Sequence, residues 1–144
     1  MTTSETSCGA RETRWTLAAL FICLAGCGAG EPSPELVARG EVLFAECAGC
    51  HSVSPDGPQI VGPTLHGVYG RRAGTLDGYE YSEAMRASGI VWRRGALDVY
   101  LEAPSEVVAG TTMNYAGVRS VADREAIIAY LQSLDERRGE PGGV

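Results

Sequence analysis

The first strong apolar pattern in the chain is a run from Trp15 to Ala25, which follows Arg11 and Arg14. A run of this length with basic residues before it is typical of a secretory signal peptide, and it is too short to span a bilayer. The pattern therefore predicts export from the cytoplasm. It also separates the N-terminus from the part of the chain that forms the folded domain.

The apolar run ends in Leu24-Ala25-Gly26-Cys27, which resembles the lipobox of bacterial lipoproteins. In such proteins cleavage precedes the cysteine, which becomes an acylated N-terminus. We therefore expect a signal peptide over residues 1–26, a lipidated Cys27, and a short tether over residues 27–34. The alternative is ordinary cleavage after the small residues at 28–30, which would release a soluble periplasmic protein.

The next segments have helical periodicity. Ser33 followed by Pro34 is a cap with proline at the first helical position. Apolar or small residues then recur at steps of three and four, at Leu36, Gly40, Leu43 and Cys47. Near the C-terminus, Ser120 and Asp123 resemble a capping box. The apolar stripe of the helix that follows consists of Val121, Ile127, Tyr130, Leu131 and Leu134.

Two shorter helices are expected between these two, over residues 82–87 and 93–103, the second ended by Pro104. The glycine- and proline-rich residues 55–78 are expected to form a loop. The chain of 144 residues fits one all-α domain over residues 35–137, with a short tail over residues 138–144. The net charge of -6 and the absence of lysine argue against a nucleic-acid partner, which would need a clustered basic surface.

The five cysteines separate by position. Cys8 and Cys23 lie in the signal peptide, Cys27 is the lipidation candidate, and Cys47 and Cys50 remain for the domain. The last two precede His51 in a C-x-x-C-H pattern, which is typical of covalent haem attachment. Residues three apart on a helical turn face the same side, so both sulfurs can bond one ring while the following histidine ligates its iron.

Three other interpretations of this pattern stay open on the residues alone. Cys47 and Cys50 could form a disulfide in an oxidising compartment, or a thioredoxin-like site, although no βαβ pattern surrounds them. A structural zinc site would need four ligands, and only His66 and carboxylates are left to join the C-x-x-C-H residues. His66 itself is expected to be a loop histidine rather than a ligand.

Beyond the haem motif, residues from about Glu35 to Arg137 resemble class I cytochromes c of the mitochondrial and bacterial c2 type. The matching segments follow the order and spacing of that family: Gly62-Pro63-Thr64-Leu65-His66-Gly67, Gly70-Arg71, Gly78-Tyr79-Glu80-Tyr81, Trp92, Tyr100-Leu101, Gly110-Thr111-Thr112-Met113 and Tyr115-Ala116-Gly117. The resemblance implies a small all-α fold with one covalent haem c, in which the first and last helices cross at a glycine, here Gly40.

The resemblance also implies a set of site residues. Met113 would be the second axial ligand, with Met85 as the rival, and a neutral thioether raises the reduction potential. Pro63 would offer its carbonyl to the His51 ring, and Tyr100 would hydrogen-bond near the Met113 sulfur. The haem propionates would be contacted by Arg71, Tyr81, Trp92 and Thr111.

The implied function is one-electron transfer between extracytoplasmic redox proteins by a monomeric carrier, not catalysis. A haem peroxidase or gas sensor is the alternative from another class, and a dedicated subunit of one redox enzyme is a third. The chain departs from the family at Ala109, where proline is expected, and at Met85, where asparagine is usual. It also lacks the lysines that ring the haem edge in mitochondrial members.

Overall fold

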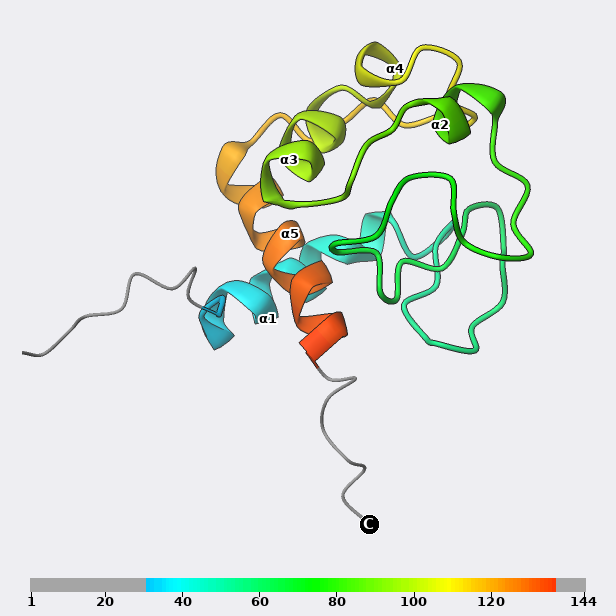
Figure 1. The fold of residues 1–144 in the computed structure, drawn as a ribbon. Helices are drawn as coiled ribbons and strands as arrows, with labels where there is room; N and C mark the ends of the chain where they lie inside the picture. The colour runs from blue at the N-terminus through cyan, green and yellow to red at the C-terminus, as the bar shows by residue number, and fades with distance from the viewer. Residues whose placement is uncertain (1–30, 137–144) are drawn as a thin grey trace, which may run out of the picture. The chain divides into compact units, whose positions relative to one another are not determined.

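In the computed structural model, residues 31–136 are described, and they form a helical domain without strands (Figure 1). The elements in chain order are α1 (Pro34–Leu43), the 3-10 turn η1 (Phe44–Glu46), α2 (Glu83–Ala87), α3 (Arg94–Glu102), α4 (Pro104–Val107) and α5 (Val121–Glu136). One isolated antiparallel bridge joins Arg72 to Val91. The expected all-α class is therefore confirmed, while the predicted signal peptide, Cys27 and residues 138–144 lie outside the described residues.

Helix α1 begins where its cap predicts. The Ser33 hydroxyl accepts a hydrogen bond from the Leu36 amide at 3.3 Å, and Pro34 occupies the first turn. The inward face is close to the expected one, because Gly40 is buried and Leu43 and Cys47 pack against the core, with Val37 in place of Leu36. Leu36 lies outside the core cluster, since the helix meets its neighbour along the Val37 and Gly40 side.

Helices α1 and α5 cross in close contact (Figure 1). A Cβ added at Gly40 would lie 1.9 Å from the backbone oxygen of Ala126 and 2.8 Å from the Cβ of Tyr130. Only glycine permits this approach, so the predicted crossing at Gly40 is confirmed. Beside it, the rings of Phe44 and Tyr130 are tilted against each other with centroids 5.4 Å apart.

Helix α5 carries most of the expected apolar stripe. Ser120 caps the helix by accepting a hydrogen bond from the Asp123 amide at 3.3 Å, while the Asp123 carboxylate pairs with Arg39 of α1 instead of completing a capping box. Val121 is 59% exposed, so its place in the stripe was wrong. The buried residues of α5 are Arg124, Ala126, Ile127, Ile128, Ala129, Tyr130, Leu131 and Leu134.

The two middle helices form close to their predicted bounds. Ser82 caps α2 through the Met85 amide at 3.2 Å, and α3 ends at Glu102, two residues before Pro104. The proline does more than end α3, because it occupies the first turn of the short helix α4, which the sequence pattern did not predict. Proline fits there because its missing N–H would have no helical partner.

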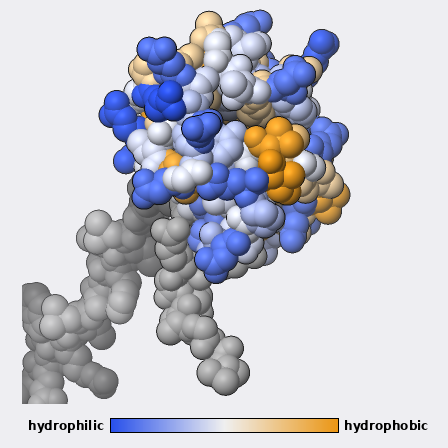
Figure 2. All heavy atoms as spheres, turned by 90° about the vertical axis from the view of Figure 1, so that its right-hand side faces the viewer, coloured by the Kyte–Doolittle hydropathy of each residue, from blue (hydrophilic) through white to orange (hydrophobic). Residues whose placement is uncertain are grey.

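The expected loop over residues 55–78 forms the side of the molecule that Figure 2 faces. That face is mostly hydrophilic and carries a few hydrophobic side chains; Ile60 and Val61 of the loop are 55% and 69% exposed. Within residues 31–136, none of the helices has both the length and the apolar character needed to cross a membrane.

Candidate functional site

A cavity of about 260 Å³ lies between the loops and the helices. Most of its wall is apolar and is shared with the hydrophobic core, through Phe44, Val68, Trp92, Leu97, Leu101, Ile127 and Leu131. Cys47, Cys50, His51 and Met113 also line it, although 62 positions of sequence separate His51 from Met113. The fold therefore brings the haem motif and the candidate methionine ligand to one apolar cavity.

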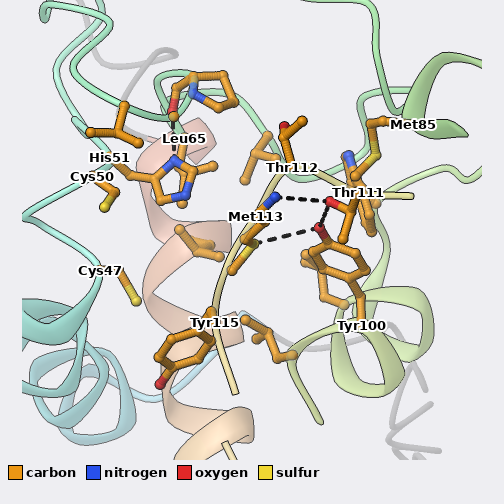
Figure 3. Close-up of a pocket in the computed structure, with 18 of the residues that line it drawn as sticks. Cys47, Cys50, His51, Leu65, Met85, Tyr100, Thr111, Thr112, Met113 and Tyr115 are labelled. Atoms are coloured by element: carbon orange, nitrogen blue, oxygen red, sulfur yellow. Dashed lines mark hydrogen bonds between the residues drawn. The ribbon is translucent and has the colours of Figure 1, made fainter. Parts of the chain in front are cut away.

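The haem motif is a tight backbone turn at the end of η1. The amides of Cys50 and His51 both donate to the Cys47 carbonyl, at 3.0 and 2.9 Å. Both thiols are free, so the structure shows no disulfide between them. Burial, and then the neighbouring Glu46 carboxylate and Cys50, raise the pKa of the Cys47 thiol. In Figure 3 the two cysteines lie on the same side of the cavity as His51.

The His51 ring is held at two points. Its Nδ1 atom lies 2.8 Å from the carbonyl oxygen of Pro63, the partner that the family resemblance implied. A nitrogen that faces a carbonyl acts as the donor, which leaves the Nε2 lone pair for a metal. Gly62 lies against the ring, and a Cβ there would come within 2.3 Å of Cε1. The local backbone therefore sets both the tautomer and the orientation of His51.

Met113 is held from the opposite side by α3. The Tyr100 hydroxyl donates to the Met113 sulfur at 3.4 Å and lies 3.3 Å from the Thr111 hydroxyl, which accepts from the Met113 amide at 3.2 Å (Figure 3). Burial raises the pKa of Tyr100, against the opposing effect of its hydrogen bond with Thr111, so the phenol remains a donor. The thioether is thus oriented by a partly buried pair of hydroxyl groups.

The C-terminal end of the Met113 loop is fixed on α3 and α5. The Val118 amide donates to the Leu101 carbonyl at 2.8 Å, and a Cβ at Gly117 would lie 2.0 Å from the Glu102 backbone oxygen. Arg124 of α5, whose side chain is 4% exposed, donates to the carbonyls of Val118 and Arg119 and forms an ion pair with Asp98 at 2.7 Å. Its hydrogen bond to Asp98 raises the pKa of Arg124, so this arginine stays charged.

The comparisons with known proteins agree with this geometry. A family model described as cytochrome c matches residues 37–135, which is most of the chain and nearly all of the helical domain. The chain belongs to the cytochrome c family.

Several relatives of this cytochrome match over almost their whole length. A cytochrome c from Gibberella zeae is 41% identical over 97 residues, which are 67% of this chain and 92% of the relative. A cytochrome c2 from Rhodomicrobium vannielii is 40% identical over 114 residues, which are 79% of this chain and 87% of the relative. The solved structure of cytochrome cH from Methylobacterium extorquens is 41% identical, with a TM-score of 0.63, and covers 67% of this chain and 97% of that one.

Membership of the family establishes a class I cytochrome c fold with one covalently attached haem c and an electron-carrying function. The residues present fit that group. The cavity has the apolar wall that a porphyrin ring needs, and the free thiols of Cys47 and Cys50 line it. The His51 imidazole, which packs against Gly62, and the Met113 thioether line it as well. Across residues 31–136, no group of three or more His, Cys, Asp and Glu side chains could hold a metal ion, as a zinc site would require.

The residues expected near the propionates lie around the same cavity. Arg71, Tyr81, Trp92 and Thr111 all line it. The Arg71 guanidinium also donates to the carbonyls of His66 and Thr64, at 3.1 and 3.2 Å, so it ties the loop together beside the cavity. Burial raises the pKa of Tyr81. The Trp92 and Tyr100 rings pack with centroids 4.8 Å apart.

The two doubtful ligand candidates are placed differently. Both histidines of the chain lie in the described part, and of these His51 lines the cavity whereas His66 does not. Met85 is buried and lines the same cavity as Met113. In Figure 3, however, the Met113 side chain lies between His51 and Tyr100, whereas Met85 lies beyond Thr111.

One contact at the cavity has no counterpart in the sequence reasoning. The Tyr115 hydroxyl donates to the Glu46 carboxylate at 3.1 Å, across 69 positions of sequence. Tyr115 belongs to one of the segments that match the family, whereas Glu46 belongs to none of them. A tyrosine two residues after the ligand candidate and a glutamate directly before the first haem cysteine were the available signal, but only the fold brings them together.

Proposed function

We propose that this cytochrome carries single electrons with His51 and Met113 as the axial ligands of its haem iron and with Cys47 and Cys50 as the attachment points. The observation that carries the proposal is the orientation of the two donors in one cavity. Pro63 directs the free nitrogen of His51, and Tyr100 donates to the sulfur of Met113. Each donor is held by a partner from outside its own segment.

When bound, the haem supplies a ferric–ferrous couple that holds one electron at a time. The chain's own residues set the reduction potential of this couple and the protonation of its histidine ligand. The neutral Met113 thioether favours the ferrous state, and the Pro63 carbonyl keeps His51 in the ligating tautomer. With His51 and Met113 both binding the iron, no position would be left for a substrate. This supports a carrier rather than a peroxidase or gas sensor.

The matched variants Met113→Leu and Met85→Leu test the ligand assignment. Each replaces a methionine of the cavity wall with leucine, which has a similar volume but no thioether sulfur. We expect the ferric wild type to show an iron–sulfur charge-transfer band that Met113→Leu abolishes and Met85→Leu keeps, with a lower reduction potential for Met113→Leu alone. If the band survives Met113→Leu and disappears in Met85→Leu, the sixth ligand is Met85.

The proposal assigns the propionate contacts to Arg71, Tyr81, Trp92 and Thr111. Their support is that all four line the cavity and bring polar groups to an otherwise apolar wall. Arg71 supplies a cation, and its donation to the Thr64 and His66 carbonyls keeps the guanidinium beside the cavity. Burying anionic propionates without such partners would be costly.

We further propose that the carrier works outside the cytoplasm, exchanging electrons with redox proteins as a monomer held by an acylated Cys27. In this proposal residues 1–26 are the signal peptide, residues 27–34 the tether, residues 35–137 the cytochrome domain and residues 138–144 a tail. The tether of about seven residues reaches roughly 25 Å when extended. Confinement near a membrane raises the effective concentration at membrane-bound partners, which offsets the missing lysines.

Replacing Cys27 with serine tests the anchor. Wild-type protein should partition with membranes and carry the mass of several acyl chains, because one chain alone gives only marginal binding. Cys27→Ser should keep its haem and lose the lipid. Wild-type protein recovered wholly soluble, without lipid and beginning near Glu31, would replace the anchored carrier with a diffusing periplasmic one.

A further inference from the structure

A side-chain hydrogen bond joins the two segments that carry the haem-binding residues. Tyr115 lies two residues after Met113, and Glu46 lies directly before Cys47. The Tyr115 hydroxyl donates to Glu46 Oε2 at 3.1 Å, and both side chains line the cavity. Figure 3 shows Tyr115 on the Cys47 side of Met113, away from Tyr100 and Thr111. The bond therefore bridges the cavity edge where those two residues do not reach.

The loop that carries Met113 needs such a restraint. Its residues Ala109, Gly110, Thr112, Asn114 and Ala116 are all exposed, so little buried surface holds the loop down. Gly110 has φ +94, a conformation that adds no stiffness, because glycine adopts it freely. The hydrogen bonds of Tyr100 and Thr111 hold the loop as far as Met113. Those of Val118 and Arg124 hold it from position 118 onward.

The chemistry of the pair suits a lasting contact. A hydrogen bond from a phenol to a carboxylate is charge-assisted and stronger than a neutral one. In this pair the phenol is the donor and the carboxylate is the acceptor.

We propose that the Tyr115–Glu46 hydrogen bond is a clasp that holds the Met113 loop closed over the haem site. Tyr115 and Glu46 are then positioning residues, which keep Met113 on the iron without touching it. The inference rests on the proposed ligation by His51 and Met113. It adds a contact between the attachment turn and the sixth-ligand loop that does not run through the haem.

Competition by imidazole on the ferric holoprotein tests the clasp. Imidazole binds the iron only when Met113 has left, so its apparent affinity reports the population of the open loop. Tyr115→Phe removes the hydroxyl and keeps the ring. We expect it to bind imidazole about three- to ten-fold more tightly than wild type, the effect of one lost hydrogen bond. Glu46→Ala should behave alike, and Glu46→Gln, which keeps an acceptor, should lie between it and wild type.

Two controls separate the clasp from a general loosening of the protein. Tyr79→Phe removes a hydroxyl that donates to the Val61 carbonyl at 2.9 Å, a bond with no partner in the Met113 loop, and should leave imidazole affinity unchanged. The double variant Tyr115→Phe with Glu46→Ala should bind imidazole no more tightly than either single variant, because both remove the same bond.

The outcomes also separate the clasp from the ligand assignment. A wild-type protein without the iron–sulfur band contradicts ligation by Met113 and the clasp with it. A wild type that shows the band, with imidazole affinities equal in wild type, Tyr115→Phe and Glu46→Ala, overturns the clasp and leaves the ligation standing. Full additivity in the double variant also overturns it, because independent effects are not a shared bond.

Discussion

Gly62 packs against the His51 ring so closely that an added Cβ would lie 2.3 Å from Cε1 and 2.6 Å from Nδ1. The same histidine is hydrogen-bonded to Pro63, the next residue in the chain after Gly62. The contact with Gly62 and the hydrogen bond to the Pro63 carbonyl therefore hold the ring in place together. The absence of a side chain at Gly62 is part of the ligand's support.

We expect Gly62→Ala to push the His51 ring off its carbonyl partner and to cost about 1–3 kcal/mol of unfolding free energy, the range for overpacking. Chemical denaturation and the visible spectrum of the ferric protein would measure both effects. Gly49→Ala is the matched control within the haem motif, because an added Cβ at Gly49 meets nothing within 4 Å. Equal stability and equal spectra in the two variants would contradict this account of Gly62.

Among the elements, the crossing of α1 and α5 depends on one position. Gly40 is buried in α1, and its backbone lies directly against the Ala126 carbonyl of α5. Around this point the Phe44 and Tyr130 rings pack together and Arg39 pairs with Asp123. Any side chain at position 40 separates the two helices and loosens these contacts with them.

We expect Gly40→Ala to lower the unfolding free energy by about 3 kcal/mol, because the clash outweighs the better helix propensity of alanine. Gly95→Ala in α3 is the opposite case, since nothing lies within 4 Å of its added Cβ. There the propensity gain stands alone, and the variant should be more stable by roughly 0.5–1 kcal/mol. Urea denaturation of both variants measures the contrast, and a loss at both positions would contradict it.

Local signals account for the elements to different degrees. Ser33 and Ser120 cap the helices that they were expected to cap, because capping involves neighbours three residues apart. Ser82, expected as the first residue of its helix, is the cap of α2. Helix α4 was missed, because Pro104 is read equally well as the end of one helix or the start of another. The exposure of Val121 was missed because apolar periodicity does not say where a helix leaves its neighbour.

At the scale of the whole molecule, the haem site and the hydrophobic core are one structure. The cavity wall includes Trp92, Leu97, Ile127 and Leu131, which also belong to the core cluster. Without a group in this partly open cavity of about 260 Å³, the apolar wall would be exposed to water, and a small domain has only about 5–15 kcal/mol of stability to set against that loss. The cofactor is therefore expected to decide whether the domain keeps its fixed packing.

We expect the double variant Cys47→Ala with Cys50→Ala to lose covalent haem and cooperative unfolding, because the core wall is left without its central contact. The measurements are haem staining on a denaturing gel, near-ultraviolet circular dichroism and Trp92 fluorescence. Cys27→Ser is the control, since it removes a cysteine outside the motif. Covalent haem in the double variant would contradict attachment through these sulfurs.

The sequence by itself determined the haem motif, the helix caps, the all-α class and the glycine at the helix crossing. These features are contained in a few neighbouring residues or in the order of family segments. The placement of His51 beside Pro63 and of Tyr100 beside Met113 was implied by that family pattern, and the structure shows these contacts.

Only the tertiary structure decided which distant side chains meet. Arg124 reaches the Asp98 side chain and the Val118 carbonyl from within α5, and Tyr115 reaches Glu46 across 69 positions. Helical periodicity describes neighbours one turn apart and contains no information on such pairs. They exist because the α1–α5 crossing and the loop around the cavity bring separate segments together, and this long-range packing, rather than any local pattern, places the Met113 loop against the haem-attachment turn.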